Sequence, residues 1–346
     1  MSNRKNYTDI MLLLAVAAMA VRGIALPIWS KSAPVNSVWD ISGAYSVISA
    51  WGFPLLVAAT GCKYLANSQS YSTGFVLKKL LPRALLGCAV WWLVSALTLM
   101  KYSNKNEIDT DTFFEAMSKA LNAPYYARFL QLVVIFFAFY PLLKRIADDK
   151  KLTGYAVIVF AVFSAVVPVM KHIPYLSYGY MFLSQLNWGF FTEFGLYLFL
   201  GIFLSRIELE WHFRVVVYCA GVISTVAMYS LTFWNYSQEK GMDKTYITEA
   251  SPFTVIQTAA VSLRISAAAK RLGLKSSGFF LESCARCSYV FVPLFAVFSG
   301  ALSKLISAQS VPLALYIPLT AFIAAACALA LGSVFRRVPI LSFISI

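Results

Sequence analysis

Charged side chains inside apolar stretches are the residues of this sequence best able to do chemistry. Asp9 opens an apolar stretch at 9–29, Arg22 lies within it, and Glu193 lies inside another stretch at 188–204. Ionisable groups are costly in hydrocarbon and normally face the interior of a helix bundle, so they mark candidate sites. Arg22 follows Asp9 by 13 residues, about 20 Å along a helix. Arg22 and Glu193 could pair, either as a structural ion pair or as an anion- or proton-handling site.

Further charges lie close to the ends of apolar stretches. Arg264 is near the end of the stretch at 252–269, and Arg286 begins the stretch at 284–303. Long cationic side chains in such places can extend to the membrane surface while their stems stay in apolar surroundings. For Asp9, Arg264 and Arg286, contact with the membrane surface therefore stands beside a functional role.

Histidine chemistry inside the apolar stretches is excluded. The two histidines, His172 and His212, both fall in loops. The sequence also contains no HExxH, no Walker glycine loop and no GxSxG. The six cysteines lie in or beside apolar stretches, which predicts buried thiols, and no metal site is predicted.

Ten apolar stretches must position these residues. The chain is 60% hydrophobic and 13% charged, and most stretches are close to the ~20 residues that a helix needs to cross a bilayer. The sequence therefore predicts one all-α domain over 1–346, a polytopic membrane bundle of about ten transmembrane helices. The stretches are 9–29, 41–62, 81–100, 128–143, 153–170, 188–204, 214–234, 252–269, 284–303 and 313–335.

The net charge of +14 indicates topology and does not indicate a nucleic-acid partner. With a cytoplasmic N-terminus, 17 Lys and Arg residues fall on the inner side and nine on the outer side, with three within or at the ends of helices. This bias is typical of cytoplasmic loops, so both termini are predicted inside. The expected location is the bacterial inner (plasma) membrane, with membrane lipid as a partner.

Two outer loops and one inner segment are long enough to matter. Residues 101–127 and 235–251 are interpreted as solvated loops, with a substrate lid as the alternative; 101–127 can also hold a short helix around Phe113 and Met117. Residues 70–83 combine apolar and basic side chains, which predicts an amphipathic piece at the inner surface.

Several segments resemble the integral-membrane acyltransferase family, the acyltransferase-3 type. The second stretch carries a Pro-Leu start and a Thr-Gly end, where the family has Pro-Leu-Phe and, after three apolar residues, Ser-Gly. A basic segment, a Tyr-Pro helix end and an Arg-x-Ser-aromatic start also match. The matching residues are Pro54 to Gly61, Phe75 to Arg83, Tyr140-Pro141-Leu142, and Arg286, Ser288 and Tyr289.

The resemblance implies the ten-helix fold and a reaction. That reaction is transfer of an acyl group, with acetyl as the expected one, from acyl-CoA to a hydroxyl of an envelope carbohydrate or lipid-linked glycan. Acyl-CoA would be a co-substrate, and no bound cofactor is expected. Thr60, Lys78, Lys79 and Arg83 would belong to the substrate site, with lipid contact as the alternative role of the three cations.

The chain departs from the family where the family's catalytic residues lie. Aligned on the first helix, the family's arginine and histidine fall on Leu12 and Gly23, and its second histidine falls on Phe295. Arg22 cannot replace a base, because guanidinium does not deprotonate in proteins.

The remaining catalytic candidates are Asp9, Arg22, Glu193 and Arg286. Two alternatives to an active acyltransferase therefore stay open. One is an inactive family member that assists glycan assembly. The other is a transporter or exporter of a glycan or small anion that uses Arg22 and Glu193.

The topology can be tested by labelling. Cysteines introduced in 101–127 and 235–251 should react with an impermeant maleimide in intact cells, because both loops are predicted outside. Cysteines introduced between Lys144 and Lys151 should react only after permeabilisation. The opposite pattern would reverse the orientation.

Overall fold

The structure, a computed structural model, describes residues 2–34, 36–66, 71–102, 115, 118, 126–170, 175–176, 179–181, 183, 194–239, 245–271, 279–305 and 311–337. Within these residues all regular structure is helical and no strand occurs. The elements are α1 (Ser2–Trp29), α2 (Ser37–Ile48), α3 (Gly52–Tyr64), α4 (Thr73–Phe75), a π-helical turn (Val76–Leu80), α5 (Leu81–Tyr102), α7 (Tyr126–Ala138), α8 (Tyr140–Asp148), α9 (Lys150–Met170), α11 (Leu196–Arg206), α12 (Trp211–Glu239), a 3₁₀ turn (Thr245–Ile247), α13 (Pro252–Arg271), α14 (Phe279–Leu305) and α15 (Leu313–Arg337).

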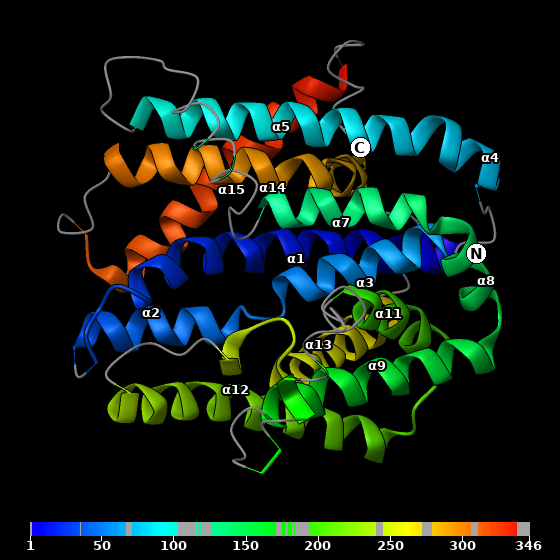
Figure 1. Ribbon diagram of the computed structural model, residues 1–346, viewed down its shortest axis with the longest axis horizontal. Helices are drawn as coiled ribbons and strands as arrows, with labels where there is room; N and C mark the ends of the chain where they lie inside the picture. The colour runs from blue at the N-terminus through cyan, green and yellow to red at the C-terminus, as the bar shows by residue number, and fades with distance from the viewer. Residues whose placement is uncertain are drawn as a thin grey trace.

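Helix α1 lies in the middle of the bundle (Figure 1). It packs against α2, α3, α13, α14 and α15. Its apolar residues surround the whole helix, and Met11, Leu12 and Ala15 are fully buried. A helix that is hydrophobic all round belongs inside a structure, which is where α1 is found.

In the described part of the chain four helices are long and apolar enough to cross a membrane, and a fifth crossing arises if one bent pair is counted. The four are Tyr7–Trp29, Ser37–Tyr64, Trp211–Ser237 and Leu313–Phe335. Each of the ten apolar stretches contains helix, although some of these helices are short, such as Leu196–Arg206. Over its described residues the protein is thus all-helical with four to five candidate membrane spans, and the ten-crossing topology stays a prediction.

The second candidate span is interrupted between Ile48 and Gly52. A side chain from another helix hydrogen-bonds the backbone at this break: Gln257 Nε2 of α13 donates to the Val47 carbonyl at 3.0 Å. Irregular backbone at membrane depth is tolerated where its polar groups are bonded inside the protein. The hydrogen bond of Gln257 therefore connects the break between α2 and α3 to α13.

The apolar stretch at 128–143 forms two helices that meet at the Tyr-Pro helix end noted in the sequence, and the bent pair can count as one span. Helix α7 ends at Ala138, and α8 begins at Tyr140 after a bend of 75°. Pro141 lies in the first turn of α8, where a missing N–H costs no hydrogen bond. The Tyr140 hydroxyl donates to the Tyr71 carbonyl at 3.2 Å, which holds the bend against the chain before α4.

Two glycines set the closest crossing, that of α3 and α11. A Cβ added to Gly61 would collide with the Leu198 carbonyl oxygen, and one added to Gly201 would lie 2.5 Å from the Ala58 carbonyl oxygen. Both obstacles are backbone atoms, which cannot rotate away. Small residues of this kind let helix backbones approach closely in membranes. Gly61 is also the glycine of the Thr-Gly end in the sequence resemblance.

We expect Gly61→Ala and Gly201→Ala to destabilise the protein by about 1–3 kcal/mol each, because each forces α3 and α11 apart. Gly300→Ala is the matched control: it is also helical, and a Cβ there meets no atom within 4 Å. That change should be neutral or stabilising by up to about 1 kcal/mol. Thermal unfolding in detergent measures all three. Equal effects at the three positions would contradict the close crossing.

Candidate functional site

Arg22 is buried in the bundle and bound to a loop. Its side chain is 4% exposed, and Nη2 donates to the Ile247 carbonyl at 2.5 Å. The same nitrogen lies 4.0 Å from Glu249 Oε1, whose side chain is 16% exposed. Nε and Nη1 of Arg22 have no hydrogen-bond partner among the described residues. We call Arg22, Ile247 and Glu249 the Arg22 site.

Glu249 is the carboxylate that the structure places beside Arg22. The predicted partner, Glu193, lies outside the described residues. Sequence reasoning missed Glu249 because the residue falls in a polar loop. The one available signal was that this loop and the C-terminal half of α1 were both assigned to the outer side.

The segment 245–251 folds into the bundle, so its interpretation as a solvated loop is wrong. None of its seven residues is exposed, and Ile247 is almost fully buried. Side chains from four helices donate to four successive carbonyls, which fixes the segment over the end of the bundle. These bonds are Arg22 Nη2 to Ile247, Thr254 Oγ1 to Thr248 at 2.9 Å, Tyr197 OH to Glu249 at 2.5 Å, and Ser164 Oγ to Ala250 at 2.9 Å.

The two positions that the resemblance assigns to histidines touch each other. A Cβ added to Gly23 would lie 2.6 Å from Cε1 of Phe295, so the phenyl ring covers the glycine. Phe295 in turn stacks on Phe291 with ring centroids 5.2 Å apart. Leu12, at the position of the family's arginine, is fully buried in the apolar core. Leu12 and Phe295 are therefore buried in apolar surroundings, and Gly23 is in contact with the Phe295 ring while remaining partly exposed.

A second polar group, which we call the tyrosine cluster, lies near the other end of α1 and consists of Thr60, Tyr64 and Tyr289. The Thr60 hydroxyl is 3.2 Å from the Tyr289 hydroxyl, and it also donates to the Leu56 carbonyl at 2.8 Å. The Tyr64 hydroxyl is within hydrogen-bonding reach of Tyr289. The three buried hydroxyls thus satisfy one another between α3 and α14.

Two charged residues accompany this cluster. Lys63 Nζ lies 4.8 Å from the centre of the Tyr289 ring, a cation–π distance. Asp9 is buried and close enough to interact electrostatically with Tyr289. The structure therefore brings Asp9 and Thr60 together, and it places Arg22 at the opposite end of α1.

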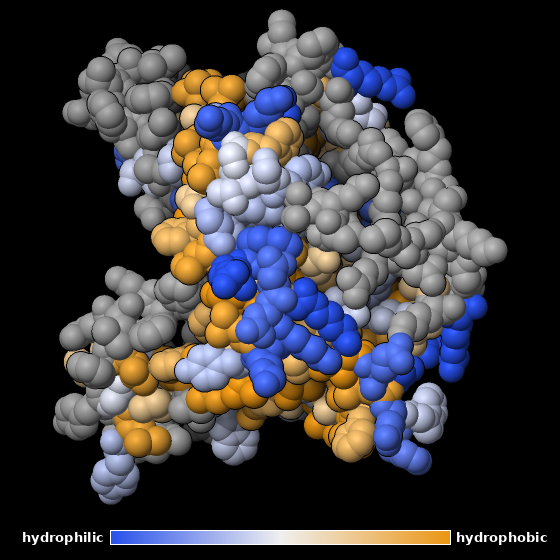
Figure 2. Space-filling view, turned by 90° about the vertical axis from the view of Figure 1, so that its right-hand side faces the viewer, coloured by the Kyte–Doolittle hydropathy of each residue, from blue (hydrophilic) through white to orange (hydrophobic). Residues whose placement is uncertain are grey.

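A row of aromatic rings leads from the tyrosine cluster to the exposed basic segment. The ring centroids of Tyr64 and Tyr71 are 5.7 Å apart, and Tyr71 stacks on Phe75 at 5.4 Å. Lys79 Nζ lies 5.5 Å from the Phe75 ring centre, and Lys78 is exposed beside it. Figure 2 views the end of the molecule at which α4 and α8 lie in Figure 1, and hydrophilic residues gather near its centre.

The remaining candidates do not join these groups. Arg83 is partly exposed near the start of α5. Arg286 is helical within α14, but its side chain lies outside what the structure describes. His212 is exposed in the first turn of α12, and His172 falls outside the described residues. Nowhere in the described part do three His, Cys, Asp or Glu side chains lie together as a metal site would need.

No protein-family model, curated protein or solved structure matches this chain. The arrangement of its own residues must therefore carry the functional argument.

We expect the single changes Arg22→Leu and Glu249→Leu each to lower the free energy of unfolding by about 3–5 kcal/mol, because each leaves a buried charge without its partner. The double variant should recover much of that loss. Lys144 and Asp148 form the control pair on the surface of α8, where their charged atoms are 2.8 Å apart.

Asp148→Asn should cost less than about 1 kcal/mol, since exposed ion pairs contribute little. Chemical unfolding in detergent compares the four proteins with the wild type. A double Arg22→Leu, Glu249→Leu variant that loses the full sum of the single effects would show that the two charges are not coupled.

Proposed function

We propose that this chain is a membrane protein of acyltransferase-like design that recognises an acidic group of an envelope glycan at the Arg22 site and does not carry out family-type acyl transfer. The observation that carries the proposal is the pair of buried Arg22 nitrogens that have no hydrogen-bond partner among the described residues, next to the apolar Gly23–Phe295 contact. The ten-crossing fold, cytoplasmic termini and inner-membrane location are part of the same proposal.

The absence of a base at the expected positions supports recognition without transfer. Moving an acyl group to a hydroxyl needs a side chain that titrates near the working pH, and such groups contribute about 10²–10⁴-fold in rate. Glycine and phenylalanine supply no such group, and the phenyl ring occupies the space above Gly23.

The chemistry of Arg22 supports an acidic ligand. A guanidinium has five donors in a planar fork that suits carboxylate and phosphate oxygens. Nη2 of Arg22 is engaged by Ile247 and Glu249, which leaves Nε and Nη1, on two different edges of the guanidinium, as separate donors to oxygens of a ligand. A carboxylate of an acidic sugar can accept from either of them. Entry of a ligand requires the segment 245–251 to move.

A second candidate, an active acyl-CoA-dependent transferase, is favoured by the aromatic row and the basic segment. Lys78 and Lys79 are exposed where the phosphates of a coenzyme would arrive, and Tyr71 and Phe75 offer stacked rings beside them. The Thr60–Tyr289 hydroxyl pair lies at the inner end of this row. This candidate needs a base that the tyrosine cluster would have to supply.

Binding and turnover distinguish the two candidates. We expect glucuronate, used as the probe, to raise the unfolding temperature of the purified protein, because a ligand that binds only the folded state stabilises it. Glucose at the same concentration should have no effect. Arg22→Lys should weaken the effect of glucuronate, since lysine keeps the charge but lacks the fork.

In parallel, hydrolysis and transfer of acetyl-CoA should stay at background. His172→Ala and His212→Ala should leave that background unchanged, because neither histidine lies in the Arg22 site. Robust acetyl transfer would overturn the proposal in favour of the second candidate. Equal stabilisation by glucose and glucuronate would show that the protein does not select an acidic ligand, and would contradict the proposal.

A further inference from the structure

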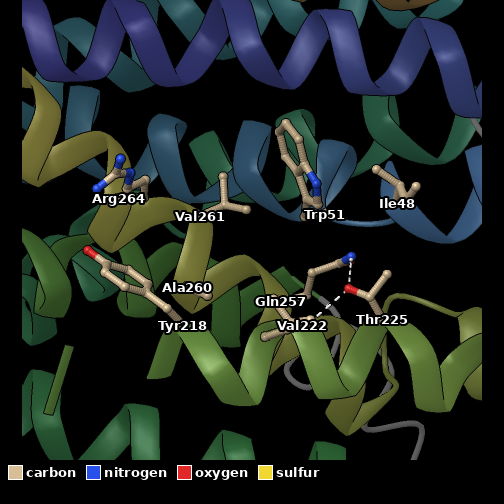
Figure 3. A pocket seen from close by; sticks show the side chains of 10 residues that line it. Ile48, Trp51, Tyr218, Val222, Thr225, Gln257, Ala260, Val261 and Arg264 are labelled. Atoms are coloured by element: carbon tan, nitrogen blue, oxygen red, sulfur yellow. Dashed lines mark hydrogen bonds between the residues drawn. The ribbon is translucent and has the colours of Figure 1, made fainter. Parts of the chain in front are cut away.

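An open groove runs along the side of the bundle between α12, α13 and the break between α2 and α3 (Figure 3). Its volume is about 450 Å³. Arg264 and Tyr218 lie at one end, and Ile48 and Thr225 lie at the other. Its volume lies within the usual range of small-molecule sites, and the groove is open along its length.

The groove lies on a surface with the character of a lipid contact. Its walls are almost entirely apolar, and the rim residues Ile48 and Val222 are 58% and 66% exposed. Helix α12, which forms one wall, is a candidate membrane span, and only 22% of its most apolar window is buried within the protein. Most of this helix therefore faces outward, which in a membrane means toward hydrocarbon chains.

Arg264 is the cation of this groove. Its side chain is exposed, and among the residues that the structure describes it has no hydrogen-bond or ion-pair partner. It lies seven residues before Arg271, the last residue of α13, or about 10 Å along the axis. Long cationic side chains near a helix end extend to the membrane surface, where anionic lipid head groups lie, so Arg264 is suited to contact an anion.

The far end of the groove offers no second charge. Gln257 and Thr225 lie there, and the Gln257 amide nitrogen is turned to the protein, with bonds to the Val47 carbonyl and to Thr225 Oγ1 at 2.9 Å. The groove therefore has one charged end and a long apolar body. This polarity matches an amphiphile with a single anionic head.

We propose that the groove binds one anionic glycerophospholipid, with its phosphate on Arg264 and one acyl chain lying along α12 toward Ile48. The Arg264 fork donates to the phosphate oxygens, and the Tyr218 ring lies beside the head group. In the predicted orientation Arg264 is near the cytoplasmic surface, where anionic lipids are concentrated. The site is separate from Arg22 and does not depend on what Arg22 binds.

Native mass spectrometry of the full chain tests this, with phosphatidylglycerol and phosphatidylcholine of identical acyl chains as probes. We expect one tightly retained phosphatidylglycerol. Arg264→Gln should weaken retention about fivefold, the effect of one cation near a lipid surface. Arg271→Gln is the matched control, because it removes a cation from the end of the same helix outside the groove.

A second pair of variants tests the acyl-chain position. Val222→Trp should fill the groove and expel the lipid, whereas Val226→Trp, on the same helix and 60% exposed, lies outside the groove and should not. Both positions face outward, so neither change should disturb folding, which a melt verifies.

Three results would overturn the proposal: equal retention of both lipids, equal loss in Arg264→Gln and Arg271→Gln, or lipid retained in Val222→Trp. A protein dimer that Val222→Trp abolishes would also overturn it, because the occupant would then be a second copy of this chain.

Discussion

Burial of the Arg22 guanidinium organises one end of the molecule. The distribution of Lys and Arg residues predicts that this end lies on the outer side of the membrane. A charge on the central helix cannot be left uncompensated in an apolar bundle, and Arg22 meets this constraint by drawing in the backbone of 245–251 and the Glu249 carboxylate. Once that segment is inside, its other carbonyls also need donors, and Ser164, Tyr197 and Thr254 supply them. A single charge thereby fixes how α1, α9, α11 and α13 meet.

The need of buried backbone carbonyls for hydrogen-bond donors also applies to the irregular elements elsewhere in the structure. The break before Gly52 is held by Gln257, and the bend at Phe139 is held by the Tyr140 hydroxyl. In each case a side chain donates to a backbone carbonyl that is distant in the sequence: Gln257 to Val47, and Tyr140 to Tyr71. Polar residues in this protein are few, and most of those described serve backbone groups.

The helices could be predicted from the sequence and their contacts could not. Hydropathy alone located all ten helical stretches, because the requirement for apolar length is local. It also singled out Arg22, since a charge in an apolar stretch is visible in one dimension. The partner Glu249 was missed, because a polar loop gives no sign of where it folds, and the Tyr-Pro helix end at Tyr140 gave the place of the bend but not its angle. The meeting of Gly23 and Phe295, 272 positions apart, follows only from packing between α1 and α14.

Gly23 and Phe295, the two positions that the resemblance assigns to histidines, come from opposite ends of the chain and lie side by side. They are complementary in size, because Gly23 leaves the space that the Phe295 ring fills. A histidine at Gly23 would collide with the ring unless Phe295 also changed. The two positions are thus coupled by packing, and neither residue has a side chain that titrates. Arg22, one residue before Gly23 on α1, has its Nε and Nη1 without a hydrogen-bond partner among the described residues.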